Sequence, residues 1–172
     1  MTSEHPTGDP IHLRPLEEAD APAIARWLED PAIASTLLGP PGCPQAAREG
    51  WRDEVARSAA DVNLGIALPD GRLVGVAALA GIDDARRGWL GLFVGERAEW
   101  GRGLGREAAA LMVAHGFERL GLEEVAARVV PENARALRVY ARLGFTRRGL
   151  EAGTLVLSLR REEWERSRAG SK

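Results

Sequence analysis

Three glycines within six residues, between a predicted strand and a long predicted helix, constrain this fold more than any other feature of the sequence. The segment reads Trp100-Gly-Arg-Gly-Leu-Gly105. Glycine allows backbone turns with positive φ, and its missing side chain lets N–H groups approach an anion closely. The N-terminus of the following helix adds the positive end of the helix dipole. The segment therefore predicts a cradle for a phosphate or pyrophosphate group.

Two familiar nucleotide-binding motifs do not fit this segment. The Gly-Lys-Ser/Thr ending of a Walker loop is missing, and the third glycine of the dinucleotide fingerprint would fall where Arg106 stands. An ordinary glycine-rich turn between a strand and a helix is the alternative interpretation. Further motifs in the chain must distinguish a phosphate cradle from an ordinary turn.

The spacing of apolar residues changes along the chain and sets the order of the predicted elements. In the middle of the chain, short apolar runs turn at Asp70-Gly71 and predict strands in a meander. Later runs alternate with helical periodicity, so we expect a mixed sheet in a single α/β (α+β) domain, without an internal repeat. Strands are expected at residues 11–16, 62–68, 72–79, 89–94, 125–130, 145–150 and 154–159. Helices are expected at residues 20–30, with Asp20 as the cap and Asp30-Pro31 as the end, and at residues 45–60, 104–120 and 133–143, with a rigid loop at 38–44.

Length and charge narrow the class of protein. The 172 residues suit one domain, and we divide them into a flexible tail (1–10), a domain (11–160) and a charged tail (161–172). That last tail, with Trp164 as its large apolar residue, either docks as a short helix or frays. With 23 Lys and Arg against 25 Asp and Glu, the net charge of −2 is too balanced for a protein that mainly binds nucleic acid.

Composition also indicates the compartment. The N-terminal residues lack a signal-peptide pattern, and no apolar run reaches the roughly 18 residues of a membrane span, so we expect a cytoplasmic protein. Lys172 is the single lysine among 23 basic residues, a bias typical of GC-rich bacterial genomes. Cys43 is the single cysteine, and a bystander thiol is a better interpretation than a nucleophile. We expect no metal site, because such a site would need further ligands from His5, His12, His115 or carboxylates.

A second segment lies after the predicted strand at 125–130 and runs from Asn133 to Phe145. On a helix that begins near Asn133, residues Leu137 and Tyr140 follow on the same face, so an amide and a hydroxyl line one groove. A core aromatic is the alternative role for Tyr140. Three arginines on neighbouring turns either contact a phosphate or are simply solvated: Arg135, Arg138 and Arg142.

Together the two segments resemble the GNAT superfamily of N-acetyltransferases. That superfamily carries an Arg/Gln-x-x-Gly-x-Gly/Ala loop and then an Asn-x-x-Ala/Ser-x-x-x-Tyr-x-x-x-Gly-Phe helix. The first motif is present with Trp100 in place of the usual Arg or Gln. The opening Leu13-Arg14-Pro15-Leu16, with Asp20 and Trp27, is similar to the ribosomal-protein N-terminal acetyltransferase type, and the resemblance spans residues 11–160. The second motif is present as Asn133, Ala136, Tyr140, Gly144 and Phe145.

The resemblance implies a single GNAT-type domain with acetyl-CoA as cosubstrate. Its sheet would be mixed and mostly antiparallel, with about seven strands splayed between strands four and five and about four flanking helices. A pantetheine arm would pair with the backbone of residues 92–94, the amides of residues 101–106 would hold the pyrophosphate, and Asn133 would bond the cofactor arm. The expected cofactor-binding residues are Leu92, Phe93, Val94, Gly101, Arg102, Gly103, Leu104, Gly105, Arg106, Asn133 and Arg138.

The same resemblance implies direct attack by a primary amine on the thioester in a ternary complex. Tyr140 would be the catalytic general acid for the departing thiolate. The position of the family's usual glutamate base is occupied here by Leu90 or an apolar neighbour. A water relay is sufficient for a peptide α-amine, whose pKa is about 7.8, but less so for a lysine amine at about 10.4. Asp83, Asp84 and Glu96 are fallback bases, though solvated loop charges are the simpler interpretation, and His115 is expected to pack or cap rather than react.

Several alternatives stay open on the sequence alone. The acceptor is a protein N-terminus or a small-molecule amine. A non-catalytic acyl-CoA-binding or sensor module is the alternative function, and a nucleotide binder would need a base or ribose contact for which no motif is found. The apolar run Val156–Leu159 is either a dimerising edge strand or part of the core, so a homodimer stays open.

Overall fold

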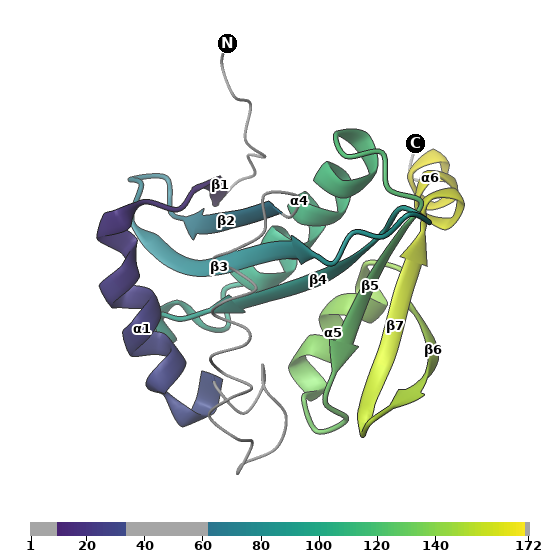
Figure 1. Ribbon diagram of the computed structural model, residues 1–172. Helices are drawn as coiled ribbons and strands as arrows, with labels where there is room; N and C mark the ends of the chain where they lie inside the picture. Colours follow the sequence, from purple (N-terminus) through teal and green to yellow (C-terminus); the bar gives the residue numbers. More distant parts are fainter. Residues whose placement is uncertain (1–9, 34–61, 171–172) are drawn as a thin grey trace.

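A seven-stranded mixed sheet organises the part of the chain that the computed structural model describes, residues 10–33 and 62–170 (Figure 1). Its strand order is β1-β2-β3-β4-β5-β7-β6. Neighbouring strands are antiparallel except β4 and β5, which run parallel. The strands are β1 (His12–Pro15), β2 (Val62–Ala67), β3 (Leu73–Ala80), β4 (Arg87–Val94), β5 (Glu124–Val129), β6 (Thr146–Glu151) and β7 (Thr154–Arg160).

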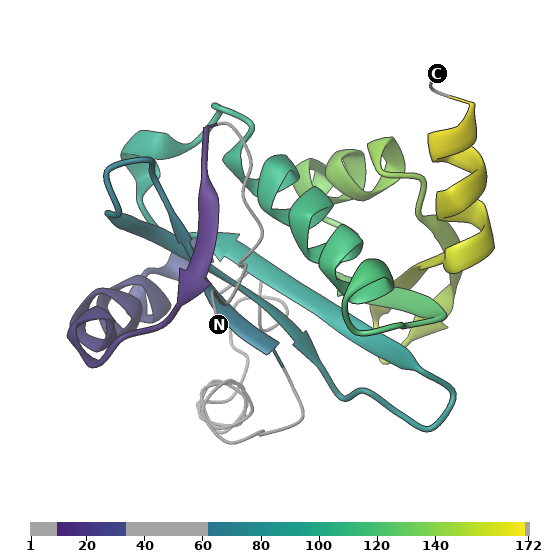
Figure 2. The ribbon, with the colours of Figure 1, turned by 90° about the horizontal axis from the view of Figure 1, so that it is seen from above.

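Helices cover both faces of this sheet. Helix α1 lies on one face, and α4 and α5 lie on the other (Figure 2). The fold class and the order of elements expected for these residues are confirmed, with element ends shifted by a few residues. The helices are α1 (Ala21–Glu29), α4 (Leu104–Glu118), α5 (Ala134–Arg142) and α6 (Arg161–Ala169), with single 3₁₀ turns η1 (Glu18–Asp20) and η2 (Arg97–Glu99).

The β2–β3 hairpin forms as its sequence predicts. Gly71 has a φ of 92° and donates its N–H to the Leu68 carbonyl at 2.8 Å, while the Asp70 carboxylate accepts from the Arg72 N–H at 2.9 Å. Strand β3 is buried along nearly its whole length because α1 and α4 cover its two faces. This explains why β3 is apolar at successive positions instead of alternating.

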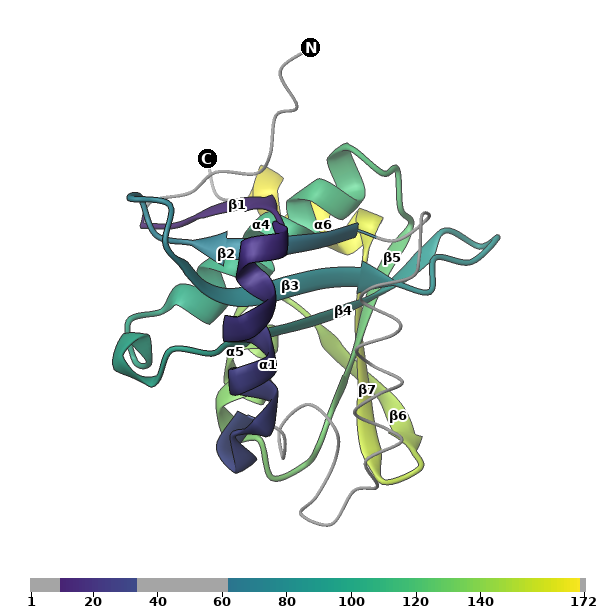
Figure 3. The ribbon, with the colours of Figure 1, turned by 60° about the vertical axis from the view of Figure 1, so that its left-hand side comes forward.

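Strands β4 and β5 separate shortly after they meet. Their parallel pairing joins residues 87–89 to residues 124–126 and does not continue beyond Trp89 and Ala126. From there β4 continues beside β3, and β5 continues beside β7 (Figure 3). The sheet therefore opens toward the carboxyl ends of β4 and β5.

Helix α4 packs closely on the sheet because small residues face it. Ala108 and Ala109 are fully buried, and a Cβ added at Gly116 would lie 3.2 Å from side-chain atoms of Leu79 and Leu122. Larger side chains of the same helix, including Met112 and Phe117, complete this core.

The charged segment after β7 forms helix α6. The Trp164 ring packs against the Phe117 ring of α4, with centroids 5.0 Å apart. The Arg161 side chain donates to the backbone carbonyls of Leu122, at 3.0 Å, and Phe117. Of the two behaviours left open for this segment, docking as a helix is the one observed.

Strand β7 lies inside the sheet, between β5 and β6. The interpretation of residues 156–159 as a dimerising edge is therefore wrong, because both long sides of β7 are already paired. Leu157 and Leu159 belong to the core. The edge strand on this side is β6, whose pairing is interrupted between Arg147 and Gly149.

Three predicted segments lie outside the described residues: positions 1–9 of the tail predicted at 1–10, the rigid loop at 38–44 with Cys43, and the helix at 45–60. Among the residues that are described, no helix is long and apolar enough to cross a membrane.

Asp20 does not cap α1 in the way the sequence suggests. Its side chain makes no capping bond to that helix. The carboxylate instead accepts bonds from both terminal nitrogens of Arg14, at 2.8 and 3.0 Å, and from the Glu17 N–H at 2.8 Å. Asp20 is buried, and the hydrogen bond from Arg14 holds its pKa below the usual value.

We predict that Asp20→Asn lowers the unfolding free energy at pH 7 by about 2 kcal/mol, as expected for losing a hydrogen-bonded charge pair. Because the folded pKa is depressed, this stability is complete above the unfolded pKa of about 4 and is lost as the pH falls through the folded value. The stabilities of the two proteins in urea unfolding should therefore converge as the pH falls below the ordinary carboxylate pKa of about 4. Asp84→Asn, in an exposed turn, is the control, and a difference that does not change with pH would contradict the prediction.

Candidate functional site

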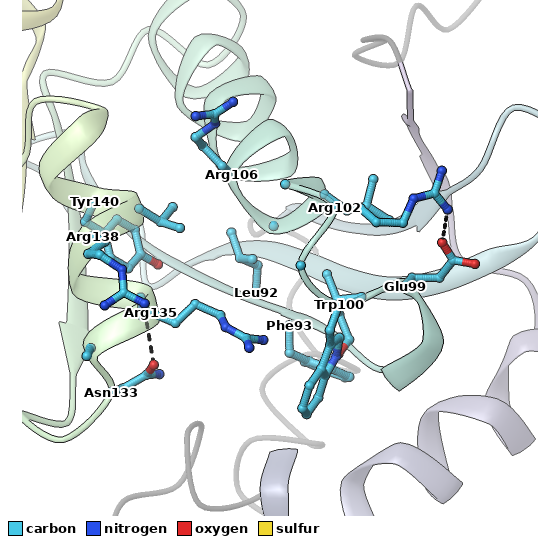
Figure 4. A pocket seen from close by; sticks show the side chains of 18 of the residues that line it. Leu92, Phe93, Glu99, Trp100, Arg102, Arg106, Asn133, Arg135, Arg138 and Tyr140 are labelled. Carbon is cyan, nitrogen blue, oxygen red and sulfur yellow. Dashed lines mark hydrogen bonds and ion pairs between the residues drawn. The ribbon is translucent and has the colours of Figure 1, made fainter.

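The open end of the split between β4 and β5 forms a cleft of about 970 Å³ (Figure 4). Its walls come from β4, from the loop and first turn of α4, and from α5, with Ala32 and Ile33 after α1. The fold thus brings the two sequence motifs to one place. Tyr140 and all the expected cofactor-binding residues line this cleft, although their binding roles stay predictions: Leu92, Phe93, Val94, Gly101, Arg102, Gly103, Leu104, Gly105, Arg106, Asn133 and Arg138.

The glycine loop has the geometry of an anion cradle. Gly101 and Gly103 have φ values of 81° and 78°, which favour glycine. Gly103 is the N-cap of α4 and no side chain caps this helix, so the N–H groups of the first turn lack intrahelical partners. A Cβ at Gly101 or Gly103 would meet no protein atom within 4 Å. This open space beside N–H groups suits a phosphate.

The exposed edge of β4 presents backbone groups to the same cleft. Peptide groups in a strand point alternately to its two sides. The Gly95 N–H donates to the Val74 carbonyl of β3 at 2.7 Å, so the peptide groups of Phe93 also face β3. Those of Leu92 and Val94 consequently face the split. The Val94 carbonyl already accepts the Trp100 indole N–H, at 2.8 Å. The backbone groups of this edge that remain for a ligand are therefore the Val94 N–H and both the N–H and the C=O of Leu92.

Asn133 has a structural role that the sequence analysis missed. Its side-chain oxygen accepts the Ala136 N–H at 3.1 Å and so caps α5. Asparagine is a favoured N-cap residue, and its place at the start of the predicted helix was the available signal. The amide nitrogen of the same side chain still has two donors for a ligand in the cleft.

Tyr140 lies on α5 across the cleft from Leu92 of β4 (Figure 4). Only 7% of the residue is exposed, and its ring packs against Phe145 with centroids 4.9 Å apart. Burial raises the pKa of the Tyr140 hydroxyl above its ordinary value. The hydroxyl therefore keeps its proton throughout the neutral range and can donate it to a group in the cleft.

The cleft is rich in positive charge. The Arg102 side chain pairs with Glu99, and the Arg135 guanidinium lies 5.2 Å from the centre of the Trp100 ring. Within the described residues, the other lining arginines form no ion pair, which leaves their charge for an anionic ligand. These are Arg106, Arg138 and Arg142.

The fallback bases are placed away from this cleft. Asp83 pairs with Arg87 and lies with Asp84 in the β3–β4 turn, at the closed end of the split. Glu96 accepts bonds from the Trp27 indole and from Arg26, each at 3.0 Å. None of these three carboxylates lines the cleft. The carboxylates among the described lining residues are Glu99 and Glu132, and Leu90 is buried in the core.

The chain matches the family model described as the acetyltransferase (GNAT) domain over residues 11–146. The chain therefore belongs to the GNAT family and is an N-acetyltransferase. It is 24% identical over 164 residues to an N-acetyltransferase 9-like protein of Nematostella vectensis, covering 81% of this chain and 76% of that protein. It is 27% identical over 145 residues to the uncharacterized N-acetyltransferase p20 of Bacillus licheniformis, covering 81% of each.

Solved structures share the fold. The spermidine N-acetyltransferase of Vibrio cholerae with CoA and spermine has a TM-score of 0.76 at 18% identity, over 92% of this chain and 99% of that one. An aminoglycoside acetyltransferase, AAC(6')-Ib, with coenzyme A has a TM-score of 0.74 at 20% identity, over 92% and 99%. RimJ of Mycobacterium smegmatis with CoA-disulfide has a TM-score of 0.66 at 24% identity, over 94% and 89%. These likenesses, each under 25% identity, show that the chain shares the fold of these three proteins.

We predict that Gly105→Val weakens CoA binding at least about tenfold without unfolding the protein. A Cβ at this position would already contact Leu92 and Val94, at 3.8 and 4.0 Å, so the two valine branches extend into the cleft. Titration calorimetry with CoA and the melting temperature together test this. Ala110→Val, on the same helix outside the cleft lining, controls for a β-branched residue in α4. An unchanged dissociation constant for Gly105→Val would show that the ligand does not approach this turn.

Proposed function

We propose that this protein transfers an acetyl group from acetyl-CoA to a primary amine by direct attack within a ternary complex. One observation carries the proposal. The glycine cradle at the start of α4, the exposed edge of β4 and Tyr140 all line the same cleft. A sequential mechanism of this kind needs no nucleophilic side chain, and it uses residues that bind, orient and transfer a proton.

Each wall of the cleft has a part in holding acetyl-CoA, which supplies the activated thioester. The N–H groups at residues 101–106 bind the pyrophosphate, helped by the dipole of α4. The backbone of Leu92 and the N–H of Val94 pair with the pantetheine arm as an added strand does. Asn133 donates its amide hydrogens to that arm, and Arg138 contacts a phosphate.

Tyr140 is the proposed catalytic acid. The amine nitrogen forms a bond to the acetyl carbon and loses one proton to water, the carbon–sulfur bond breaks, and the sulfur takes the hydroxyl proton of Tyr140. A raised pKa keeps that proton in place before each turnover. The tyrosine regains a proton from solvent after the products leave.

The carboxylates of the cleft support an acceptor with a weakly basic amine. Among the described lining residues these are Glu99, which is already paired with two arginines, and Glu132. A peptide α-amine with a pKa of about 7.8 is roughly one-seventh neutral at pH 7, so it can react without a dedicated carboxylate base. We therefore propose a peptide N-terminus, or a small α-amine, as the acceptor.

The test combines binding and turnover on the intact protein. Calorimetric titration with acetyl-CoA is followed by thiol release against a peptide panel, spermidine, an aminoglycoside and a peptide with a blocked N-terminus and one free lysine. Binding with release on free peptide N-termini supports the proposal. Release with another amine corrects the acceptor class. Binding without release supports a non-catalytic acyl-CoA sensor, which the apolar Leu90 position would suit, and no binding excludes the proposed function.

We predict that Tyr140→Phe lowers kcat by about 10²–10⁴-fold, the usual effect of losing a general acid. The dissociation constant for CoA should stay within about twofold, because phenylalanine keeps the packing on Phe145. In the wild type, titration of Tyr140 should cause no fall in kcat below about pH 10, the ordinary tyrosine value. Equal losses of binding and turnover would instead make Tyr140 a structural residue.

A further inference from the structure

Glu99 is a buried carboxylate directly before the glycine loop. It ends the turn η2 and is 8% exposed, although it lines the cleft. One carboxylate oxygen accepts from Arg72 at 3.1 Å, and the other pairs with Arg102 (Figure 4). With two cations for one carboxylate, the buried charge is compensated.

The glycine loop needs a side chain to hold it in shape. Glycine has more backbone freedom to lose than any other residue, so a loop rich in glycine is costly to order when a ligand binds. Arg102 lies between Gly101 and Gly103. Contacts of its side chain can therefore fix the conformation of the loop tip.

The Arg102 side chain is turned toward Glu99 at the edge of the cleft, away from Tyr140 and Arg138 (Figure 4). Its guanidinium points to Glu99, while the loop around it lines the cleft (Figure 4). Glu99 in turn pairs with Arg72, which directly precedes β3, so the tip of the loop is tied to the sheet. On the preceding side, the indole of Trp100 is fixed by its bond to the Val94 carbonyl.

We propose that Glu99 is a positioning residue for the cofactor cradle. It acts through Arg102, whose side chain fixes the loop while the backbone N–H groups of residues 101–106 bind the phosphate. The carboxylate is about 10% exposed, so its pairs are less screened than surface pairs, even though both arginines are about 55% exposed. This inference rests on the proposed binding of acetyl-CoA.

The experiment is a double-mutant cycle on the whole chain, with Glu99→Gln, Arg102→Gln and the double variant. We expect each single variant to raise the dissociation constant for CoA and the KM for acetyl-CoA about tenfold, with kcat within about twofold. The double variant should bind no more weakly than Glu99→Gln alone, because both single changes break the Glu99–Arg102 pair and Glu99→Gln already removes the pair with Arg72 as well. Arg102 is exposed, so its replacement keeps a folded protein even where Glu99→Gln lowers the melting temperature.

Direct binding of phosphate by the Arg102 side chain would give a different order of CoA affinities among the variants. If the Arg102 side chain binds phosphate directly, Arg102→Gln weakens binding while Glu99→Gln, which releases Arg102, leaves binding unchanged or strengthens it. That result, or additive losses in the double variant, overturns the proposal. Glu118→Gln removes a pair with Arg168 far from the cleft and is the matched control. A wild type that binds no CoA contradicts the proposed function itself, whereas normal wild-type binding with unaffected variants contradicts the role of Glu99 alone.

Discussion

The parallel contact between β4 and β5 covers three residue pairs and then ends, and the rest of the structure is arranged around that divergence. An unpaired strand edge is ordinarily a liability that proteins cover or shorten. Here the edge of β4 lies inside the molecule, with α4 starting from one side of the opening and α5 from the other. A ligand that pairs with this edge, as proposed for the pantetheine arm, would complete the hydrogen bonding that the sheet leaves open.

Local signals account for most of what could be predicted. The hairpin at Asp70-Gly71 depends on residues within the turn itself, and the strand–glycine–helix order around Gly103 depends on neighbours in sequence. The cleft residues could be predicted for the same reason, because the loop before α4 and the face of α5 each form a short continuous motif. Their meeting in one cleft followed from the resemblance to a known family and not from spacing, since the sequence alone does not determine where β4 and β5 separate.

Long-range partners account for most of what could not be predicted. Asp20 had the local signature of a helix cap, yet Arg14 reaches it with two bonds and keeps the carboxylate from the helix. Glu99 lies in a charged turn and belongs to neither sequence motif, and its partner Arg72 is distant in sequence. Strand β6 is mostly exposed and β7 mostly buried, and their order in the sheet follows from the pairing of β7 with β5. In each case the deciding contact joins segments that no local pattern connects.

The two ends of helix α4 differ in whether their free backbone groups have side-chain partners. Its first turn faces the cleft with donors that no side chain caps, whereas Arg161 from α6 neutralises carbonyls at and beyond its last turn. This arrangement follows the direction of the helix dipole, so the pole that attracts anions stays accessible while the opposite pole is covered. Helix α6 lies at the end of α4 remote from the cleft (Figure 1). A domain fused after α6 would therefore start on the far side of the molecule and leave the cleft mouth clear.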